Sequence, residues 1–423
     1  MNQEDPIVVT GLGAVSPLGV GVAVNWRRLI AGQSGIVANT RFDVSDYGCK
    51  VAGLVPAKSD DPEGFDPLDF LDLKDSRKTS LFIQFALAAA AEGLHQADWH
   101  PDDSYRRSRT AVIMATLGGF PAITDAVTIL SRRGPRGLSP HVIPSFLPNL
   151  AAGHVSIRHG FTGPIGCPAT ACAASVQAIG DGLRLIATGE ADVAVCGGTE
   201  ACVDPVSIGG FCAARALSTR FNDQPEKASR PFDKRRDGFV LSEGAAVIII
   251  ERLSHARARG AAALGILAGY GTCADAYHIT AGRPDGAGGA VAMRAALAMA
   301  EMGPEDIDYL NAHSTSTSVG DLAEIAAIGT VFAGRGKNLA VTSTKSATGH
   351  LQGAAGALAA IYSLLALRHG VVPPSLNIEE PEEGVAQFDL VANAAKEKHL
   401  DAVLLNGFGF GGVNASLILK RLA

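Results

Sequence analysis

One cysteine and two distant histidines are the residues whose types and surroundings best suit covalent chemistry. Cys172 is preceded by the run Gly-Cys-Pro-Ala-Thr-Ala (residues 166–171), and the small residues after it predict a helix that begins at the thiol. A helix N-terminus favours the thiolate form of a cysteine through its dipole and its unpaired N–H groups. Cys167 precedes a proline, which favours extended backbone before the helix. Cys172 is therefore the candidate nucleophile, with a small buried apolar residue as the alternative.

The two histidines lie in contexts that suit hydrogen bonding to a reacting group. His313 follows the strand-like run 307–310 and precedes a Ser/Thr-rich turn, and strand ends are where α/β folds place reactive groups. His350 comes five residues after Lys345 and just before an apolar helical segment, where the helix dipole opposes protonation. Neutral imidazoles can donate hydrogen bonds to a developing enolate oxygen. Taken singly, each histidine is also explained as a polar structural residue.

A lysine and a glycine-rich turn complete the candidate site. Lys345, if near an acid such as Glu324, can tune both histidines, although a lone lysine is usually a solvated surface charge. The turn at residues 406–412 formally matches GxGxxG, but only 11 residues follow Gly412, too few for a dinucleotide-binding crossover. The sequence instead indicates a glycine-hinged turn that presents backbone N–H groups and a phenylalanine. An ordinary tight turn between core strands stays the alternative.

Alternating strands and helices must position these residues. Strand-like runs, most of them followed by glycine, begin at residues 7, 111, 193, 246, 264 and 402. Helices are expected at residues 80–94, 174–186, 288–300 and 356–367. This alternation predicts an α/β protein built in layers. A soft boundary near residues 256–262 divides the chain into two similar α/β halves, residues 1–261 and 262–423.

Composition excludes several classes of protein. The 423 residues are 47% hydrophobic and 18% charged, with a formal net charge of −6, which argues against disorder and against a broad nucleic-acid surface. The seven cysteines form no CxxC pair, which disfavours a disulfide framework or a structural zinc site. Residues 346–367 fit a buried helix better than a membrane span, and the acidic start (residues 1–6) has no signal pattern. We expect a soluble enzyme of a reducing, cytoplasmic compartment.

With these motifs in view, the sequence resembles the β-ketoacyl-acyl-carrier-protein synthases of the thiolase superfamily, especially the elongating type II group. The resemblance covers nearly the whole chain, and its motifs occur in the family's order. Besides the cysteine and histidine segments, they are residues 8–13, 16–19, 215–218, 230–233, 236–240, 275–278 and 409–412. The implied fold is the thiolase-like, duplicated α/β fold with five layers (α-β-α-β-α), in an obligate homodimer.

The resemblance also implies residue roles. Its Cys-His-His triad maps onto Cys172, His313 and His350, with Lys345 as the active-site lysine and Glu324 as its acidic partner. The amides of Cys172 and Phe410 would form the oxyanion hole, and Phe410 would be a gate beside the mobile loop 275–289. The implied substrate contacts are Thr315 and Thr317 on the pantetheine arm, Leu117 in the acyl pocket near the dimer interface, and Phe408. The implied docking residues for the carrier protein are Arg77, Lys78, Arg136 and Arg215, with Arg132 and Arg133 nearby.

The implied reaction is a decarboxylative Claisen condensation on acyl carrier protein (ACP). The thiolate of Cys172 takes an acyl group from acyl-ACP, malonyl-ACP loses CO2, and the resulting carbanion attacks the thioester to give β-ketoacyl-ACP. The two histidines stabilise the enolate. No redox cofactor and no metal are needed, because loss of CO2 drives carbon–carbon bond formation.

Four positions depart from the family's common residues. Ala359 stands where many relatives have a glutamate that contributes to a monovalent-cation site, so such a cation is in doubt. Ser314 replaces a glycine, and Gly407 and Val413 replace a serine and a threonine. These changes leave the reaction class intact and keep open a specialised synthase for polyketides or for long or unusual acyl chains.

Three rival classes of the same superfamily fit the sequence less well. A non-catalytic, chain-length-factor-like subunit would lack the nucleophile. A thiolase would have a second cysteine near the C-terminal glycine turn, whereas the last cysteine here is Cys273. An initiating synthase would have an asparagine where this chain has His350. Elongation of ACP-bound chains is therefore the main hypothesis.

Overall fold

The computed structural model describes residues 4–422, and its centre is one long mixed sheet. The strand order is β13-β11-β10-β15-β16-β9-β1-β8-β7-β5-β6. The two halves of this sheet meet where β1 (Ile7–Ser16) pairs antiparallel with β9 (Gly265–Ala274). That junction is narrow, since only Val8 with Ile266 and Val9 with Gly265 are paired.

The same pairing pattern occurs on both sides of the junction. In each half, three antiparallel strands are followed by parallel ones. The N-terminal set after β1 is β8 (Gly244–Arg252), β7 (Val193–Glu200), β5 (Thr110–Ala115) and β6 (Ile165–Gly166). The C-terminal set after β9 is β16 (Val413–Lys420), β15 (Ala402–Gly409), β10 (Tyr309–Asn311), β11 (Ala340–Thr342) and β13 (Asp389–Leu390). This repetition confirms the predicted duplication.

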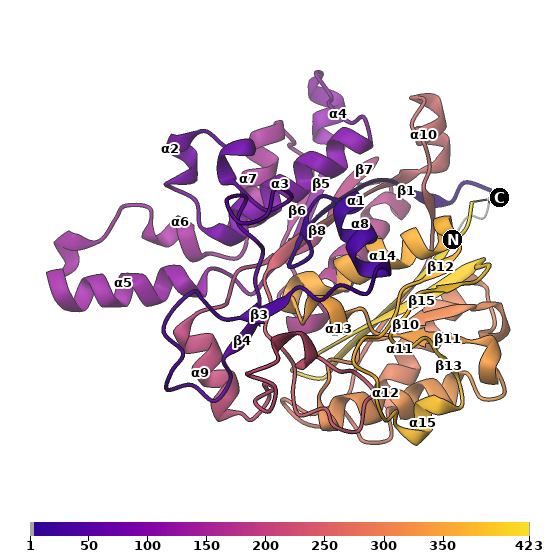
Figure 1. Cartoon of the computed structure of the whole chain (residues 1–423). Coiled ribbons are helices and arrows are strands. Elements are labelled where there is room, and N and C mark those ends of the chain that lie inside the picture. Colours follow the sequence, from indigo (N-terminus) through magenta and orange to yellow (C-terminus); the bar gives the residue numbers. More distant parts are fainter. Residues whose placement is uncertain (1–3, 423) are drawn as a thin grey trace.

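Helices form three layers around the two half-sheets (Figure 1). The outer layer over the N-terminal half contains α3 (Leu81–Gln96) and α7 (Leu150–His159). The layer between the half-sheets contains α8 (Ala174–Ala187) and α14 (Ala355–His369). The outer layer over the C-terminal half contains α11 (Ala287–Ala300) and α12 (Ser318–Val331). The order α-β-α-β-α is therefore as predicted.

The remaining elements are short or peripheral. They are β2 (Gly19–Val20), α1 (Val22–Ile30), β3 (Ile36–Ala38), β4 (Val51–Gly53), α2 (Leu73–Ser76), α4 (Ser104–Ser108), α5 (Phe120–Arg133), α6 (Val142–Phe146), α9 (Pro205–Ala213), α10 (Leu253–Ala258), α13 (Lys345–Thr348), β12 (Val371–Val372), α15 (Glu383–Ala386) and β14 (Lys396–Glu397). The predicted division at residue 261/262 falls between α10 and β9, and as a domain boundary it stays a prediction.

Several strands continue through the glycines that follow the predicted runs. In β1, a Cβ atom on Gly11 would lie 2.0 Å from the carbonyl oxygen of Gly93 in α3. In β9, a Cβ atom on Gly269 would lie 2.3 Å from the carbonyl oxygen of Ala296 in α11. These glycines do not end the strands, because their role is to let a helix backbone lie directly on the sheet.

The four predicted helices are confirmed, with ends that differ by at most two residues. The uncharged segment 346–367 is buried as predicted but is not one helix, because Gly349 ends the short helix α13 and α14 begins only at Ala355. Helix α14 belongs to the middle layer and is buried on all sides except near its C-terminal end. Within residues 4–422, no helix combines the length and the apolarity needed to cross a membrane. The predicted lack of a signal pattern concerns residues 1–6, of which 1–3 lie outside the described part.

Candidate active site

The structure brings the predicted nucleophile and both histidines together. Cys172 lies in the 3-10 turn Ala171–Ala173 that leads into α8. His313 follows β10, and His350 lies between α13 and the 3-10 turn Gln352–Ala354. The Sγ atom and a ring nitrogen of each histidine are within 4.8 Å of one another. All three line one cavity of about 390 Å³, so they can act on one substrate.

Burial favours the protonated form of the Cys172 thiol, in the opposite direction to the thiolate expected from the sequence. Burial raises the pKa of Cys172 to about 12. The positive charge of Lys345 and the backbone N–H groups of Cys172 and Phe410 act in the opposite direction on this pKa, but they do not compensate for burial. Desolvation therefore outweighs the helix terminus. The thiol needs a proton acceptor before it can attack, and the two amides that face the sulfur are placed to receive a developing oxyanion.

His350 is held by hydrogen bonds of its backbone, while its ring makes no hydrogen bond to the described residues. Its amide donates to the carbonyl oxygen of Val240 (2.8 Å), and its own carbonyl accepts from the amide of Ser242 (3.1 Å). Both ring nitrogens are buried and have no hydrogen-bond partner among the described residues. Burial, followed by the charge of Lys345, lowers the pKa of His350 well below 6.5. The ring is neutral as predicted, but the reason differs, since α14 begins only at Ala355.

His313 is positioned through the carboxylate of Glu324. This carboxylate accepts the backbone amides of His313 (2.8 Å) and Ser314 (2.6 Å), and the Ser314 hydroxyl adds a third bond (2.8 Å). Serine in place of the family's glycine thus reinforces the turn. Burial, then the charges of Lys345 and His350, lower the pKa of His313 well below 6.5. The ring centroids of His313 and His350 are 5.4 Å apart at an interplanar angle of 80°.

Lys345 is buried beside the triad and is not the solvated charge that a lone lysine suggests. The residue is only 4% exposed, and its Nζ donates a hydrogen bond to the carbonyl oxygen of Ala312 (3.3 Å). Burial lowers the pKa of Lys345 to about 8, while the carboxylate of Glu324 opposes this shift. No ion pair joins the two residues within the described chain. Glu324 therefore acts on Lys345 through its charge, and its direct contacts are with the His313 turn.

The glycine turn is shorter than predicted, because β15 continues to Gly409. Gly411 and Gly412 take positive φ angles of 85° and 76°, which glycine adopts without strain. The amide of Gly411 donates to the carbonyl oxygen of Ile279 (2.7 Å), so the turn is tied to the predicted mobile loop. At Gly407 a Cβ atom would lie 2.7 Å from Val176 Cγ2, so a serine there would require Val176 to shift.

The other predicted site residues divide into two groups. Thr315, Thr317, Phe408, Phe410 and Arg215 line the cavity with the triad. Leu117 is absent from the described residues that line it, and its amide donates to the carboxylate of Glu200 (2.6 Å). The predicted docking residues Arg77, Lys78 and Arg136 lie outside the cavity, and each is exposed or half-buried.

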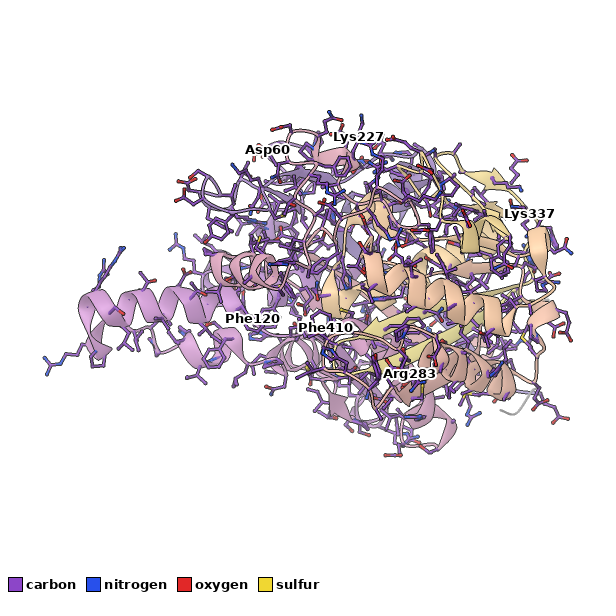
Figure 2. The ribbon with its side chains drawn as sticks, turned by 90° about the horizontal axis from the view of Figure 1, so that it is seen from below. Asp60, Phe120, Lys227, Arg283, Lys337 and Phe410 are labelled. Carbon is purple, nitrogen blue, oxygen red and sulfur yellow. The ribbon has the colours of Figure 1, made fainter. Side chains whose placement is uncertain are left out.

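Sequence reasoning missed several residues of the cavity. Gln352 lines it and was not predicted, while Asp275 and Arg283 were predicted only as part of the loop 275–289 and also line it. Figure 2 shows Arg283 near Phe410 on the face seen from below. The amide oxygen of Gln352 lies 3.6 Å from the sulfur of Cys172. Phe239 contacts the ring of His350 edge to face, with centroids 5.5 Å apart. The only available signal was a glutamine in an apolar segment two residues after His350.

The fold and the site together define a thiolase-fold condensing enzyme. The chain belongs to the β-ketoacyl synthase family: residues 4–256 match the model "Beta-ketoacyl synthase, N-terminal domain" and residues 264–379 match "Beta-ketoacyl synthase, C-terminal domain". The predicted recognition and the acyltransferase class are thereby confirmed.

Curated and solved relatives agree with this assignment. The chain is 46% identical to 3-oxoacyl-[acyl-carrier-protein] synthase 2 of Rhizobium meliloti (strain 1021), over 98% of both chains. A β-ketoacyl synthase from Burkholderia phymatum STM815 superposes with a TM-score of 0.90 at 31% identity, covering 99% of this chain and 100% of that one. A solved complex described as a type II PKS acyl-carrier protein with its ketosynthase contains a chain that superposes with a TM-score of 0.89 at 30% identity, over 99% of both chains.

Proposed function

We propose that the chain elongates fatty acyl groups by condensing acyl-ACP with malonyl-ACP, with release of CO2. The observation that carries this proposal is the convergence of Cys172, His313 and His350 within 4.8 Å in one cavity. The name of the Rhizobium meliloti relative supports fatty-acid elongation over the more specialised alternatives.

The first half-reaction transfers the acyl group to the protein. Because the thiol of Cys172 is protonated, a neutral imidazole accepts its proton as the sulfur attacks the thioester carbonyl. The carbonyl oxygen becomes an oxyanion between the amides of Cys172 and Phe410. The oxyanion then collapses, the bond to the pantetheine sulfur breaks, and the imidazole returns its proton to that sulfur.

The second half-reaction forms the carbon–carbon bond. The bond between the malonyl carboxylate and its second carbon breaks, CO2 leaves, and the electron pair becomes an enolate. N–H groups of His313 and His350 stabilise its oxygen, and each ring offers one such donor in the neutral form that burial favours. The second carbon then attacks the Cys172 thioester, the C–S bond breaks with its electron pair on sulfur, and β-ketoacyl-ACP forms. The sulfur anion takes up one proton from solvent, which restores the thiol.

An elongation assay tests the proposal directly. Purified protein with acyl-ACPs of graded length and malonyl-ACP is expected to yield β-ketoacyl-ACPs two carbons longer, with one CO2 released per product, read by mass spectrometry of the carrier. CO2 release without a longer product at any chain length would contradict the function. Heat-inactivated protein is the control for uncatalysed decarboxylation.

Lys345 is expected to set the pH range of decarboxylation. Its charge lowers the pKa of both histidines, and the neutral forms are the active ones, so activity should persist as pH falls through about 6.5. Lys345→Met removes that charge, raises both pKa values and moves the acidic limb of the profile to higher pH. Malonyl-ACP decarboxylation measured between about pH 5 and about pH 8 checks this. Lys74→Met, on the exposed helix α2, should leave the limb in place, and an unmoved limb in Lys345→Met would contradict the role.

Binding of ACP is supported by the residues around the cavity. Thr315 and Thr317 line it with hydroxyl oxygens 3.3 Å apart, where they can hold the pantetheine arm. Arg215 is exposed at the same cavity, and it would steer an acidic carrier together with the other predicted docking residues. We expect Arg215→Glu to raise KM for acyl-ACP, less so at high salt, and to leave KM for acyl-pantetheine unchanged.

A homodimer is supported by the unpartnered apolar face of α5, which projects from the body of the protein (Figures 1 and 2). Phe120, Ile123, Val127 and Leu130 share this face and are 40–56% exposed. We expect Val127→Asp to shift the protein to the monomer in size-exclusion chromatography with light scattering, because it buries a charge at the interface. Thr128→Asp, on another face of α5, is the matched control. A wild-type monomer at micromolar concentration would contradict the dimer.

We further propose that the reaction requires no cofactor and no monovalent cation. At the position of the family's glutamate, the carbonyl of Ala359 accepts from the Asn311 side chain (3.3 Å), whose own amide oxygen has no partner among the described residues. One amide oxygen without a nearby carboxylate fits a cation poorly. Leu117 and Phe408 remain the proposed acyl contacts. A cytoplasmic, reducing location is supported by the seven free cysteines.

A further inference from the structure

Gln352 is a buried polar residue in the acyl-accepting cavity, and the steps above do not use it. It is only 3% exposed and lines the cavity together with Cys172, His313 and His350. Its amide oxygen accepts from the thiol of Cys172 at 3.6 Å. Its amide nitrogen is buried and has no hydrogen-bond partner among the described residues. An unpaired buried donor is costly, so it indicates a group that a substrate satisfies.

The backbone fixes the direction of this side chain. Gln352 has a positive φ angle of 47°, which is unfavourable for a residue with a Cβ atom. The next residue is held from two sides: a Cβ atom on Gly353 would lie 2.9 Å from Glu200 Oε1 and 3.3 Å from Thr116 Cα. The turn Gln352–Ala354 therefore cannot move away from the cavity without displacing β7 and the segment after β5.

The reach of the amide selects one part of an acyl chain. In the acyl-enzyme, the third carbon of the chain is three bonds from Sγ, and the nitrogen of Gln352 is two bonds from the oxygen that contacts Sγ. The oxygen on the first carbon already has its donors, the amides of Cys172 and Phe410 that face the sulfur. The free N–H group of Gln352 is thus within reach of an oxygen carried by the third carbon.

We propose that Gln352 is a specificity-determining residue that recognises acyl chains with an oxygen on the third carbon, as a hydroxyl or a ketone. This inference rests on the proposed function, because it requires an acyl group on Cys172. An oxygen acceptor pairs with the buried N–H group, whereas a saturated chain covers that group and leaves it unpaired. The residue thereby changes the relative rates of two substrates that have the same length.

The test compares two acyl-ACPs that differ at one atom, octanoyl-ACP and 3-hydroxyoctanoyl-ACP. Transfer to Cys172 without malonyl-ACP is followed by intact-protein mass spectrometry, and kcat/KM is obtained for each. In the wild type, the 3-hydroxy chain is expected to be accepted at least as well as the saturated chain. Gln352→Leu should lower the ratio of hydroxy to saturated kcat/KM by roughly tenfold or more, since a lost hydrogen bond and a relieved unpaired donor both act on this ratio.

Two more variants separate this role from the alternatives. Gln352→Met keeps an unbranched chain without polar N–H or C=O groups, and it should reproduce the change if the leucine variant folds poorly. Gln387→Leu, an exposed glutamine, should leave the ratio unchanged. A general oxyanion donor would predict equal losses for both substrates, and that result would overturn the proposal, as would an unchanged ratio in both variants or a wild type that rejects the 3-hydroxy chain.

Failure of the inference is distinguishable from failure of the proposed function. If the wild type forms no adduct on Cys172 with any acyl-ACP, the proposed function is wrong, and the specificity proposal falls with it. If adducts form and are elongated but replacing Gln352 leaves the ratio unchanged, only the specificity proposal is wrong.

Discussion

Replacement of Cys172 by alanine is expected to abolish acyl-enzyme formation and to reduce condensation by at least about 10⁴-fold, as loss of a covalent nucleophile generally does. Among the described residues, Cys172 is the one cysteine whose sulfur is grouped with ring nitrogens of both His313 and His350, all within 4.8 Å of one another. Adducts are measured by intact-protein mass spectrometry after incubation with acyl-ACP, and condensation by product formation with malonyl-ACP.

The fold should survive this substitution, because alanine suits the small-residue turn Ala171–Ala173. The cost in unfolding free energy is expected to be about 1 kcal/mol, measured by denaturant unfolding. The matched control is Cys167→Ala, which removes the neighbouring half-buried thiol and should retain acylation. An active-site adduct on Cys172→Ala would show that the nucleophile has been assigned wrongly.

Replacement of His313 by alanine is expected to reduce malonyl-ACP decarboxylation by roughly 100- to 1,000-fold, the usual cost of one oxyanion-type donor. Acyl transfer to Cys172 should fall much less, because its oxyanion is held by backbone amides and His350 remains to accept the thiol proton. The two half-reactions are measured separately, acylation without malonyl-ACP and decarboxylation on enzyme already acylated.

The comparison needs a control for stability as well as for chemistry. His399→Ala removes a histidine with 74% side-chain exposure and should change neither half-reaction. Both His313→Ala and His313→Asn keep the backbone bond to Glu324, and His313→Asn also keeps a side-chain N–H donor, so it tests whether a donor without the imidazole restores decarboxylation. Equal losses in acylation and decarboxylation would contradict the division of roles between the two histidines.

The fold was predictable because its signals are local and repeated. The apolar runs near residues 193 and 246 and the helix after Cys172 depend on short-range patterns, and the structure contains them almost unchanged. Strand ends were less predictable. Gly11 and Gly269 look like stops in sequence, but their role depends on contacts with helices that the local sequence does not reveal.

The reactive residues were predictable in identity but not in protonation. Local arguments about helix ends favoured a thiolate at Cys172 and assigned the neutral state of His350 to a helix dipole. Burial decides both, raising the pKa of Cys172 and lowering that of His350. Burial is produced by segments from the whole chain, so a local sequence pattern does not reveal it. The same holds for Lys345, whose enclosure turns a common surface residue into part of the site.

The middle layer has a consequence for synthesis of the protein on the ribosome. Helix α8, which follows Cys172, packs in one core with α14, a helix translated much later. During translation the N-terminal half therefore exposes the apolar face of α8 before α14 exists to pack on it. Cys172 also lacks His313 and His350 until most of the chain has been made. We expect ribosome-associated chaperones to bind the nascent chain. We expect condensing activity only after the C-terminal strands have left the ribosomal exit tunnel.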